Sequence, residues 1–392
     1  MLNSPFAPWP SFSDEEIAAV TDVLRSGRVN YWTGTLCRDF EKEFAAWCGV
    51  NHAVALSNGT LALDVALKAL GVGPGDEVIV TPRSFMASVS TVATAGAIPV
   101  FAEVDRDSQN ITAETIRAVL TPRTKAIIPV HLAGQPCDMD PIMELAAEHG
   151  LFVIEDCAQA HGALYKGRSV GSIGHVGAWS FCQDKIMSTG GEGGMVTTND
   201  PELWSAMWSY KDHGKSWEGV HNRPHPPGPR LVHDTFGTNW RMLEMQAAIG
   251  LIQLRNLDTW VARRNQIADA LRSACSRHTQ VLRTPVPAED MHHAYYRFYV
   301  FVEAGNLADG WSRDRIIQEI NERGVPCMHG SASEIYLEQA FDGTGWRPLQ
   351  RFPVARELGE TSIALLTHPT ITDEQVGKAC QVIDEVCKLA AA

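Results

Sequence analysis

The chain has 392 residues, a formal net charge of −13 and a hydrophobic content of 45%, which fits a globular enzyme with one large and one smaller domain. The negative charge argues against a nucleic-acid-binding protein, no apolar run reaches the roughly 18 residues of a membrane span, and the first residues, MLNSPFAPWPSF, do not resemble a signal peptide. Nine cysteines without a C-x-x-C pair predict neither a disulfide framework nor a metal site, and favour a reducing cytoplasm.

The first fifty residues predict two amphipathic helices separated by a loop. Ser13 and Glu16 form a capping-box pattern, and apolar residues then recur on one helical face between Ile17 and Leu24. The loop is NYWTG, residues 30–34, and it is both polar and aromatic. The second helix follows it, with aromatic residues spaced for one face at Phe40, Phe44 and Trp47.

From residue 53 the pattern alternates between strands and helices. Strands are expected at 53–57, 77–81, 98–104, 125–131 and 151–155, and helices between them at 61–70, 86–95 and 141–149. Alternation of this kind implies right-handed crossovers and a mostly parallel sheet. Continuous apolar runs such as AIIPV and FVI are typical of strands that are covered on both faces. The fold class is therefore α/β.

The second half of the chain is less regular. A loop rich in Pro, Gly and His spans 213–230 and is expected to be mobile. Further elements are helices at 202–210, 240–254, 258–275, 313–323 and 373–389, and a strand at 296–302. This change of pattern places a domain boundary near residue 255, with a large domain of residues 1–255 and a small α+β domain of residues 256–392.

Four signals for chemistry fall just past predicted strand ends, where open α/β sheets bind their ligands. Gly59 and Thr60 open a helix after the first strand, an arrangement that suits a phosphate. Phe85 follows the second strand, Asp156 follows 151–155, and Lys185 follows a strand at 178–182, in a turn before a glycine-rich loop. Taken singly, each has a plain structural explanation: a tight turn, a core aromatic, a satisfied cap and a solvated lysine.

Together the four signals match the needs of one cofactor, pyridoxal phosphate. Its aldehyde forms a Schiff base with a lysine, its ring nitrogen needs a carboxylate, its phosphate needs a cradle, and its ring needs a flat neighbour. Lys185 is expected to be partly desolvated, and desolvation lowers the pKa of an ammonium group. A dinucleotide site is not indicated, because no G-x-G-x-x-G follows the first strand.

Two longer stretches, EDCAQAHGA (155–163) and WSFCQDKIMSTGGEGGMVTT (179–198), resemble the DegT/DnrJ/EryC1/StrS group of nucleotide-sugar aminotransferases. SNGTLALDVAL, PVHLAG and GTNWRMLEMQAAIGLIQL are similar to further blocks of that family, in the same order. The resemblance implies the aminotransferase fold of type I and a homodimer with shared active sites. It also implies that residues 1–30 pack with the small domain.

The resemblance assigns roles to individual residues. Lys185 would bind the aldehyde, Asp156 the ring nitrogen, and Phe85 would stack on the ring. Gln159 would lie near the ring. Gly59, Thr60 and Ser180 would hold the phosphate, and Asn239 would reach it from the partner subunit. The residues expected near the sugar are His329, Tyr31 and Trp32, although many relatives have a tyrosine where this chain has Gly330 and Ser331 after the histidine.

The function implied is transamination of a nucleotide-linked keto-deoxysugar, with L-glutamate as amino donor, in polysaccharide or lipopolysaccharide sugar biosynthesis. One alternative is an aminotransferase for a cyclitol or an aminobenzoate-like precursor, and another is a non-catalytic sensor that binds pyridoxal phosphate. A sugar dehydratase is a third, but those relatives carry a histidine in place of the lysine, so Lys185 argues against it. The partners expected are these small molecules and a second copy of the chain, with no nucleic acid and no membrane.

Overall fold

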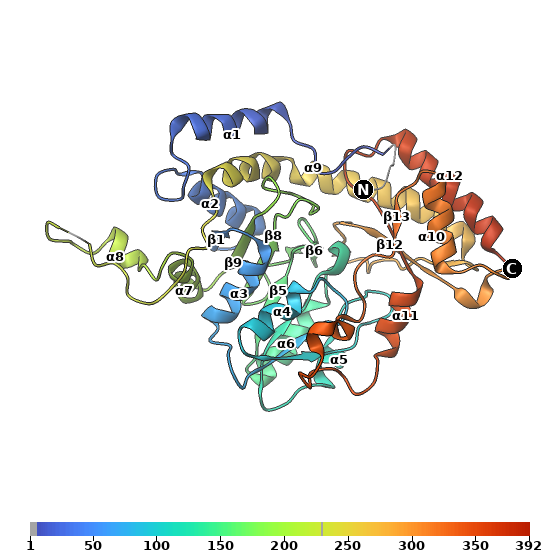
Figure 1. Cartoon of the computed structure of the whole chain (residues 1–392), viewed down its shortest axis with the longest axis horizontal. Coiled ribbons are helices and arrows are strands. Elements are labelled where there is room, and N and C mark those ends of the chain that lie inside the picture. The colour runs from blue at the N-terminus through green and yellow to red at the C-terminus, as the bar shows by residue number, and fades with distance from the viewer. Residues whose placement is uncertain (1–5, 229) are drawn as a thin grey trace.

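The computed structural model describes residues 6–228 and 230–392, and a seven-stranded sheet lies at its centre (Figure 1). The strand order is β1-β9-β8-β5-β4-β2-β3, in which β9 runs antiparallel to both of its neighbours and the other neighbouring pairs are parallel. The bounds are β1 His52–Leu56, β9 Gly194–Thr198, β8 Val176–Ser180, β5 Phe152–Asp156, β4 Thr124–Ile128, β2 Glu77–Val80 and β3 Ile98–Phe101. The predicted α/β class with a mostly parallel sheet is confirmed.

Both faces of this sheet are buried, as the continuous apolar strands predicted. Successive side chains of a strand point to opposite faces, and Val78 and Val80 accordingly lie in one hydrophobic cluster while Ile79 lies in another. The same alternation separates Ile154 from Val153. The helices packed around the sheet are α2 (Leu36–Cys48), α3 (Gly59–Ala69), α4 (Ala87–Thr94), α5 (Ala113–Arg117), α6 (Met139–His149) and α7 (Pro201–Lys211).

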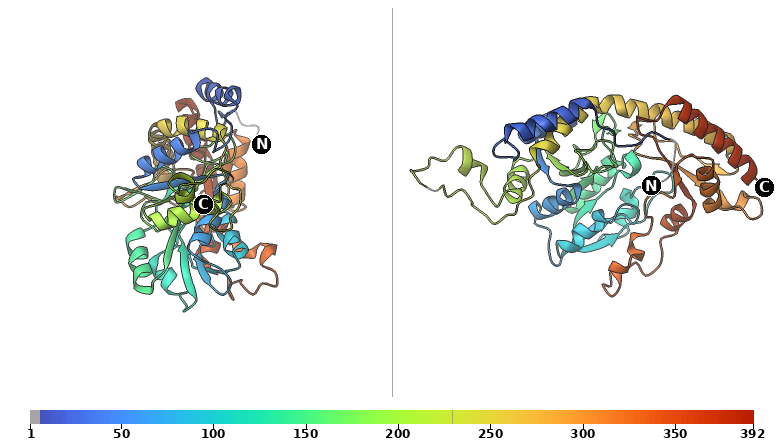
Figure 2. Two further views of the ribbon diagram at one scale, coloured as in Figure 1. Left: turned by 90° about the vertical axis from the view of Figure 1, so that its left-hand side faces the viewer. Right: turned by 45° about the horizontal axis from the view of Figure 1, so that its top comes forward.

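One long helix, α9 (Glu244–Cys275), replaces the two helices predicted at 240–254 and 258–275. The prediction of a break was wrong because the intervening residues, Arg255 to Leu257, include neither proline nor glycine to stop a helix. α9 packs against α1 and α2 and also against α12 (Asp373–Ala390). Figure 2 shows α9 and α12 side by side. The domain boundary expected near residue 255 therefore falls inside a helix that contacts both parts of the chain.

A third hydrophobic cluster forms around the C-terminal part of the chain. A four-stranded sheet in the order β10-β12-β14-β13 packs there with α10 (Arg313–Glu322) and α12. Helix α11 (Pro353–Thr361) packs instead in the cluster that contains Ile79 and Val153, through Ala355 and Leu358. A separate small sheet pairs β11 with the β6–β7 hairpin. The strands are β10 Leu282–Arg283, β11 Met291–His292, β12 Phe298–Val302, β13 Cys327–Met328, β14 Ser362–Leu365, β6 Leu164–Tyr165 and β7 Arg168–Ser169.

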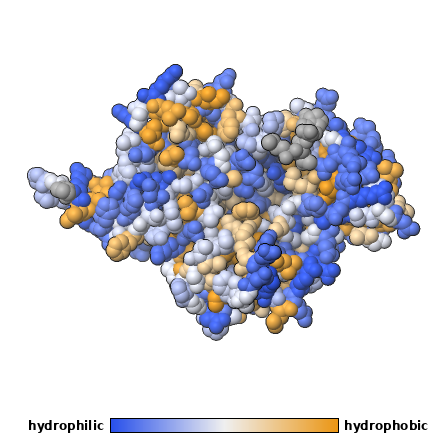
Figure 3. Space-filling model, viewed as in Figure 1, coloured by the Kyte–Doolittle hydropathy of each residue, from blue (hydrophilic) through white to orange (hydrophobic). Residues whose placement is uncertain are grey.

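The first helix, α1 (Asp14–Ser26), begins with the predicted capping box, in which Glu16 accepts a 2.6 Å hydrogen bond from the Ser13 amide. Its apolar stripe, however, faces solvent: Ile17 is 58% exposed and Leu24 is 56% exposed. Glu16 is buried against α9 instead, where it accepts a 2.8 Å hydrogen bond from Gln253. Figure 3 shows hydrophobic residues gathered over α1 at the top of this face. Local patterns thus predicted the cap but not which side of the helix would be covered.

The predicted loop 213–230 belongs to an arm that projects from the body and carries the short helix α8 (Trp217–His221) (Figure 1). Beyond α8 the arm exposes two large apolar side chains, Leu231 at 85% and Phe236 at 99%. The arm's mobility stays a prediction. No helix among the described residues combines the length and hydrophobicity that a bilayer span requires.

Candidate active site

A cavity of about 500 Å³ opens where β5 and β8 end and α3 begins. Its volume lies in the range of small-molecule and cofactor sites. Seven residues that were predicted from separate stretches of sequence line this one space: Gly59, Thr60, Phe85, Asp156, Gln159, Ser180 and Lys185. Every residue expected to hold the cofactor therefore lines this one cavity, apart from Asn239, which was expected to reach the phosphate from a partner subunit.

The start of α3 lies against the end of β8. Asn58 caps the helix by accepting a 3.0 Å hydrogen bond from the Leu61 amide, so the amides of Gly59 and Thr60 belong to the exposed first turn. A Cβ atom on Gly59 would come within 2.5 Å of the Ser180 Cβ, so only glycine lets the two elements approach this closely. First-turn amides beside the hydroxyls of Thr60 and Ser180 suit a phosphate group.

Asp156, the last residue of β5, is buried at the bottom of the cavity. Its carboxylate accepts a 2.7 Å hydrogen bond from the Ser88 hydroxyl and a 3.1 Å hydrogen bond from the Ala158 amide. Burial raises the pKa of Asp156, although both hydrogen bonds and the charge of Lys185 oppose the rise. No cation forms an ion pair with this carboxylate within the described part of the chain. A protonated ring nitrogen would supply the missing positive charge.

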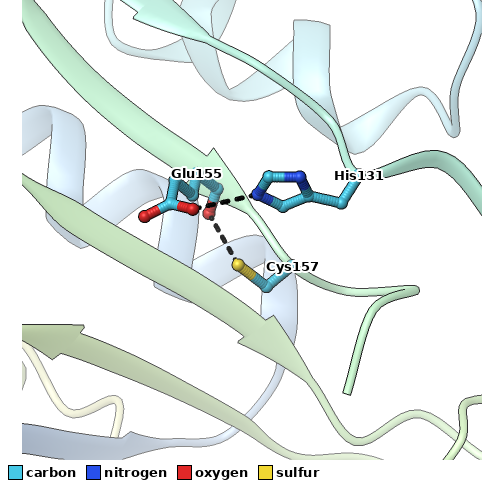
Figure 4. Close-up of side chains that lie close together, drawn as sticks. All are labelled: His131, Glu155 and Cys157. Carbon is cyan, nitrogen blue, oxygen red and sulfur yellow. Dashed lines mark hydrogen bonds and ion pairs between the residues drawn. The ribbon is translucent and has the colours of Figure 1, made fainter. Parts of the chain in front are cut away.

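The residues on either side of Asp156 belong to a buried cluster with His131 (Figure 4). Glu155 accepts hydrogen bonds from His131 at 3.0 Å and from the amides of Gly171, Ile173 and Gly174. The Cys137 amide donates to His131 Nδ1 at 3.0 Å, so the imidazole proton is assigned to Nε2. Both imidazole nitrogens and the carboxylate are thus engaged in hydrogen bonds, which gives His131, Glu155 and Cys157 a structural role in holding the end of β5 instead of a metal-binding one.

Lys185 lies in the turn after β8, and its side chain is 15% exposed. Nζ lies 3.3 Å from Asp184 Oδ1 and 5.1 Å from the centre of the Tyr296 ring. Burial opposes the charge, but Tyr296 and Asp184 outweigh burial, and the pKa of Lys185 is raised. The expectation of a lowered pKa was wrong, because the sequence did not show that an acid and a phenol surround the amine. Asp184 precedes Lys185 directly, whereas Tyr296 lies far along the chain and gives no local signal.

Phe85 and Gln159 complete the cavity. Phe85 is 70% exposed, which is unusual for a phenylalanine and leaves its flat ring free to stack on an aromatic ligand. Gln159 is buried and accepts a 2.8 Å hydrogen bond from the Ala133 amide, which fixes its side chain. Sequence reasoning missed Ser88, although it stands three residues after Phe85, one helical turn further on.

Four predicted residues do not line this cavity. Tyr31 is only 1% exposed, Trp32 donates a 2.7 Å hydrogen bond to Asp212, and Asn239 lies at the surface. His329 is exposed and lies 3.2 Å from Asp314. Their roles toward a sugar, or toward a partner's phosphate site, stay predictions.

Trp9 connects the N-terminal segment to the lysine turn. Its indole N–H donates a 2.8 Å hydrogen bond to the Lys185 carbonyl. The ring stacks on His368, with centroids 6.1 Å apart, and the guanidinium of Arg264 lies 5.4 Å from its centre. No sequence motif marked Trp9 as functional, yet its hydrogen bond holds the backbone of Lys185 in place.

Two histidines near this site should make the protein unstable in mild acid. Burial, with Lys185 and Arg264 nearby, lowers the pKa of His161 to about 3, and burial, with Arg264 and Arg297 nearby, lowers the pKa of His368 to about 3. Neither ring nitrogen of His161 has a hydrogen-bond partner among the described residues. Below pH ~6.5 each of these histidines binds a proton in the unfolded chain but stays neutral in the folded chain. Each therefore lowers the free energy of unfolding by about 1.4 kcal/mol per pH unit.

Urea unfolding at pH 7 and pH 5 measures this effect. We expect the free energy of unfolding to fall by about 2 kcal/mol for each of the two histidines between pH 6.5 and 5. His161→Phe should keep the packing on Trp179 and Phe181 and reduce the pH-dependent loss by about 2 kcal/mol, the share of His161. An unchanged pH dependence in this variant would contradict the assignment.

The chain resembles proteins of known class over nearly its whole length. The sequence profile of the DegT/DnrJ/EryC1/StrS aminotransferase family matches residues 10–384. GDP-perosamine synthase of Caulobacter vibrioides is 38% identical over 90% of each chain, and spore coat polysaccharide biosynthesis protein SpsC of Bacillus subtilis is 37% identical over 98% of this chain and 97% of its own. The crystal structure of an aminotransferase from Psychrobacter cryohalolentis superposes with a TM-score of 0.97 at 60% identity, covering 97% of this chain and 98% of that one.

Proposed function

Because this chain belongs to the DegT/DnrJ/EryC1/StrS family of aminotransferases, which depend on pyridoxal phosphate, we propose that it transfers the amino group of L-glutamate to a nucleotide-linked keto-deoxysugar. The product would be an amino sugar for polysaccharide or lipopolysaccharide synthesis in the cytoplasm. Relatives named for GDP-perosamine and spore coat polysaccharide synthesis support this substrate class. A bound pyridoxal phosphate supplies an electron sink for the carbanion at the reacting carbon.

The observation that carries the proposal is a second cavity, of about 420 Å³, joined to the first at Lys185. Both cavities are lined by Ser84, Phe85, Gln159, Asp184 and Lys185. The second one extends toward the C-terminal part of the chain, where Tyr296, Arg297 and Tyr299 line it. A substrate bound in this second cavity would reach Lys185, which also lines the first cavity, where the residues expected to bind the cofactor lie.

Each residue then has a defined task. The first turn of α3 and Ser180 would hold the phosphate of a bound pyridoxal phosphate, and Asp156 would keep a proton on its ring nitrogen. Phe85 would cover one face of the ring and keep water from it. The amine of Lys185 would act as the acid and base that moves a proton to and from the reacting carbon, first for the amino acid and then for the keto sugar.

The test incubates the holoenzyme with L-glutamate and a panel of nucleotide keto-sugars, and reads the products by mass spectrometry. We expect one sugar to show the mass change of a keto oxygen replaced by a hydrogen and an amino group, with 2-oxoglutarate formed in equal amount. If the sugars stay unchanged while a cyclitol ketone or an aminobenzoate precursor is aminated, the substrate class is wrong. If no acceptor is aminated and glutamate does not alter the cofactor spectrum, a sensor role is favoured instead.

We further propose that the active unit is a homodimer. The apolar side chains of Ile17 and Leu24 on α1, and of Leu231 and Phe236 on the arm, are exposed in the single chain. Exposed apolar clusters of this kind are typical of protein interfaces. Asn239 lies at the surface, outside its own chain's cavity, which is compatible with a role in the site of a partner.

Mixing two inactive variants tests the shared site. Lys185→Ala and Asn239→Trp chains are unfolded together, refolded together and assayed. A mixed dimer has one site with both intact contributions, so random pairing should restore about a quarter of wild-type activity. The control mixes Lys185→Ala with Asp156→Asn, whose lesions lie in the same chain's cavity, and should stay inactive. If mixed dimers form and the first mixture is also inactive, Asn239 does not act across the interface.

A further inference from the structure

The second cavity contains a positive charge, Arg297, that forms no ion pair with any described residue. Arg297 is half-buried and lines the cavity that ends at Lys185. Its one hydrogen bond runs from Nη1 to the Tyr296 carbonyl, at 3.3 Å, and its guanidinium lies 4.6 Å from the centre of the Tyr296 ring. No carboxylate forms an ion pair with it among residues 6–228 and 230–392. Most of its five N–H donors are therefore available to a ligand.

The neighbouring charges strengthen this site for an anion. Arg264, fully buried nearby, also lacks an acidic partner within the described chain, and the charge of Arg297 contributes to the lowered pKa of Arg264. The nearest acid, Asp184, is engaged by Lys185 and by the Tyr296 hydroxyl. An anion placed beside Arg297 would consequently meet two cations of the cavity lining, Arg297 and Lys185. The carboxylates in the same lining are Asp184, which is already engaged, and Glu338, which is exposed at the surface.

We propose that Arg297 binds the α-carboxylate of the amino-acid donor. A guanidinium offers paired N–H groups that match a carboxylate. The donor's reacting nitrogen must lie beside Lys185, and its carboxylate carbon is only about 2.5 Å from that nitrogen. The carboxylate can therefore be reached only by a cation next to Lys185. Arg297 meets this condition, because both side chains line the same cavity and lie near the same ring: Lys185 Nζ is 5.1 Å and the Arg297 guanidinium 4.6 Å from the centre of Tyr296, which places the two cations at most 9.7 Å apart.

This inference rests on transamination as the reaction, and adds the residue that selects an α-amino acid as donor. A carboxylate on the sugar, or the diphosphate of the nucleotide, would be an alternative ligand for the same guanidinium. The diphosphate is separated from the keto carbon by the sugar ring, so it fits a cation close to Lys185 less well. The experiment distinguishes these anions.

The test compares Arg297→Gln with the wild-type holoenzyme in the first half-reaction, which cofactor absorbance follows without any sugar. Loss of a charge-assisted hydrogen-bonded pair should raise the apparent Kd for L-glutamate by about 10- to 100-fold, with a smaller change in the limiting rate. L-isoglutamine, in which an amide replaces the α-carboxylate, should bind the wild type weakly and bind the variant no worse. Arg297→Lys, which keeps the charge, should recover part of the affinity.

A binding measurement gives a readout that does not depend on turnover. Titration calorimetry with 2-methyl-L-glutamate, whose α-carbon has no proton to lose, should show the same loss of affinity in Arg297→Gln. The matched control is Arg315→Gln, since Arg315 also packs on an aromatic ring, Trp311 at 4.3 Å, but lies outside the cavity. The control should bind like the wild type. Circular dichroism of each variant checks that the fold is kept.

Three results would overturn the inference: unchanged affinity for glutamate in Arg297→Gln, equal loss of affinity for glutamate and isoglutamine, or an increased KM for the nucleotide sugar alone. The last result would assign Arg297 to the sugar carboxylate or the diphosphate. A result that contradicts the proposed sugar acceptor can be distinguished from one that contradicts the Arg297 inference. If the wild type takes the amino group from glutamate but delivers it to no nucleotide sugar, the proposed acceptor is wrong while the Arg297 site stands.

Discussion

Replacing Lys185 with alanine should abolish transamination while the protein still folds. The variant loses both the amine that binds the cofactor aldehyde and the base that moves the proton, and proton transfer alone contributes about 10²- to 10⁴-fold in enzymes. Asp184 keeps its hydrogen bond from the Tyr296 hydroxyl, so removing the lysine does not leave this carboxylate without a partner. A cooperative thermal transition should therefore persist.

Borohydride trapping tests directly whether Lys185 is the residue that binds the cofactor aldehyde. Reduction of the wild-type holoenzyme should fix the cofactor to the peptide that contains Lys185, and reduction of the alanine variant should fix none. Lys215→Ala is a suitable control, because Lys215 is also a partly buried lysine paired with an aspartate, Asp212 at 2.9 Å, but lies outside the cavity. Cofactor fixed to a different lysine in the Lys185→Ala protein would show that the assignment is wrong.

The second large effect is expected for Asp156→Asn. A neutral amide cannot hold the proton on the ring nitrogen, so the cofactor should remain bound but act poorly as an electron sink. Loss of a buried charge partner costs about 3–5 kcal/mol, which corresponds to a rate about 10²- to 10⁴-fold slower. The amide can still accept from the Ala158 amide and donate to the Ser88 hydroxyl, so the packing should survive.

Single-turnover kinetics with L-glutamate give the rate, and nitrogen NMR of labelled cofactor gives the protonation state of the ring. Both should change in Asp156→Asn. Asp64→Asn is the control: Asp64 is half-buried on α3, burial raises its pKa, and it does not line the cavity. Near-normal turnover in Asp156→Asn, with the ring still protonated, would remove Asp156 from the mechanism.

Much of the candidate site could be predicted from the sequence because it follows a rule of topology. The carboxyl ends of neighbouring parallel strands lie at one edge of a sheet, so residues that directly follow strands share one region of space. Asp156 and Lys185 follow β5 and β8, which are neighbours in the sheet, and Gly59 opens the helix that lies against the end of β8. Phe85 follows β2 and joins them. Only strand positions and chain order were needed.

The features that could not be predicted depend on distant parts of the chain. Whether the polar or the apolar side of α1 is covered depends on α9, more than two hundred residues away in sequence, where Gln253 binds Glu16. The raised pKa of Lys185 depends on Tyr296, and the Lys185 backbone is held by Trp9. Electrostatic effects vary with distance and burial, and neither can be read from spacing along the chain.

The sequence by itself determined most strands and helices of the large sheet, the capping box of α1, and four signals that meet in the first cavity: the turn at Gly59 and Thr60, Phe85, Asp156 and Lys185. These rest on short-range periodicity and on the common edge of parallel strands. Only the tertiary structure decided that α9 is continuous, that Ile17 and Leu24 of α1 are exposed, and that Arg297 lines a cavity with Lys185 and forms no ion pair with the described residues. The physical reason is that exposure and charge environment are set by contacts between segments that are remote in sequence, whereas secondary structure is set mainly by near neighbours.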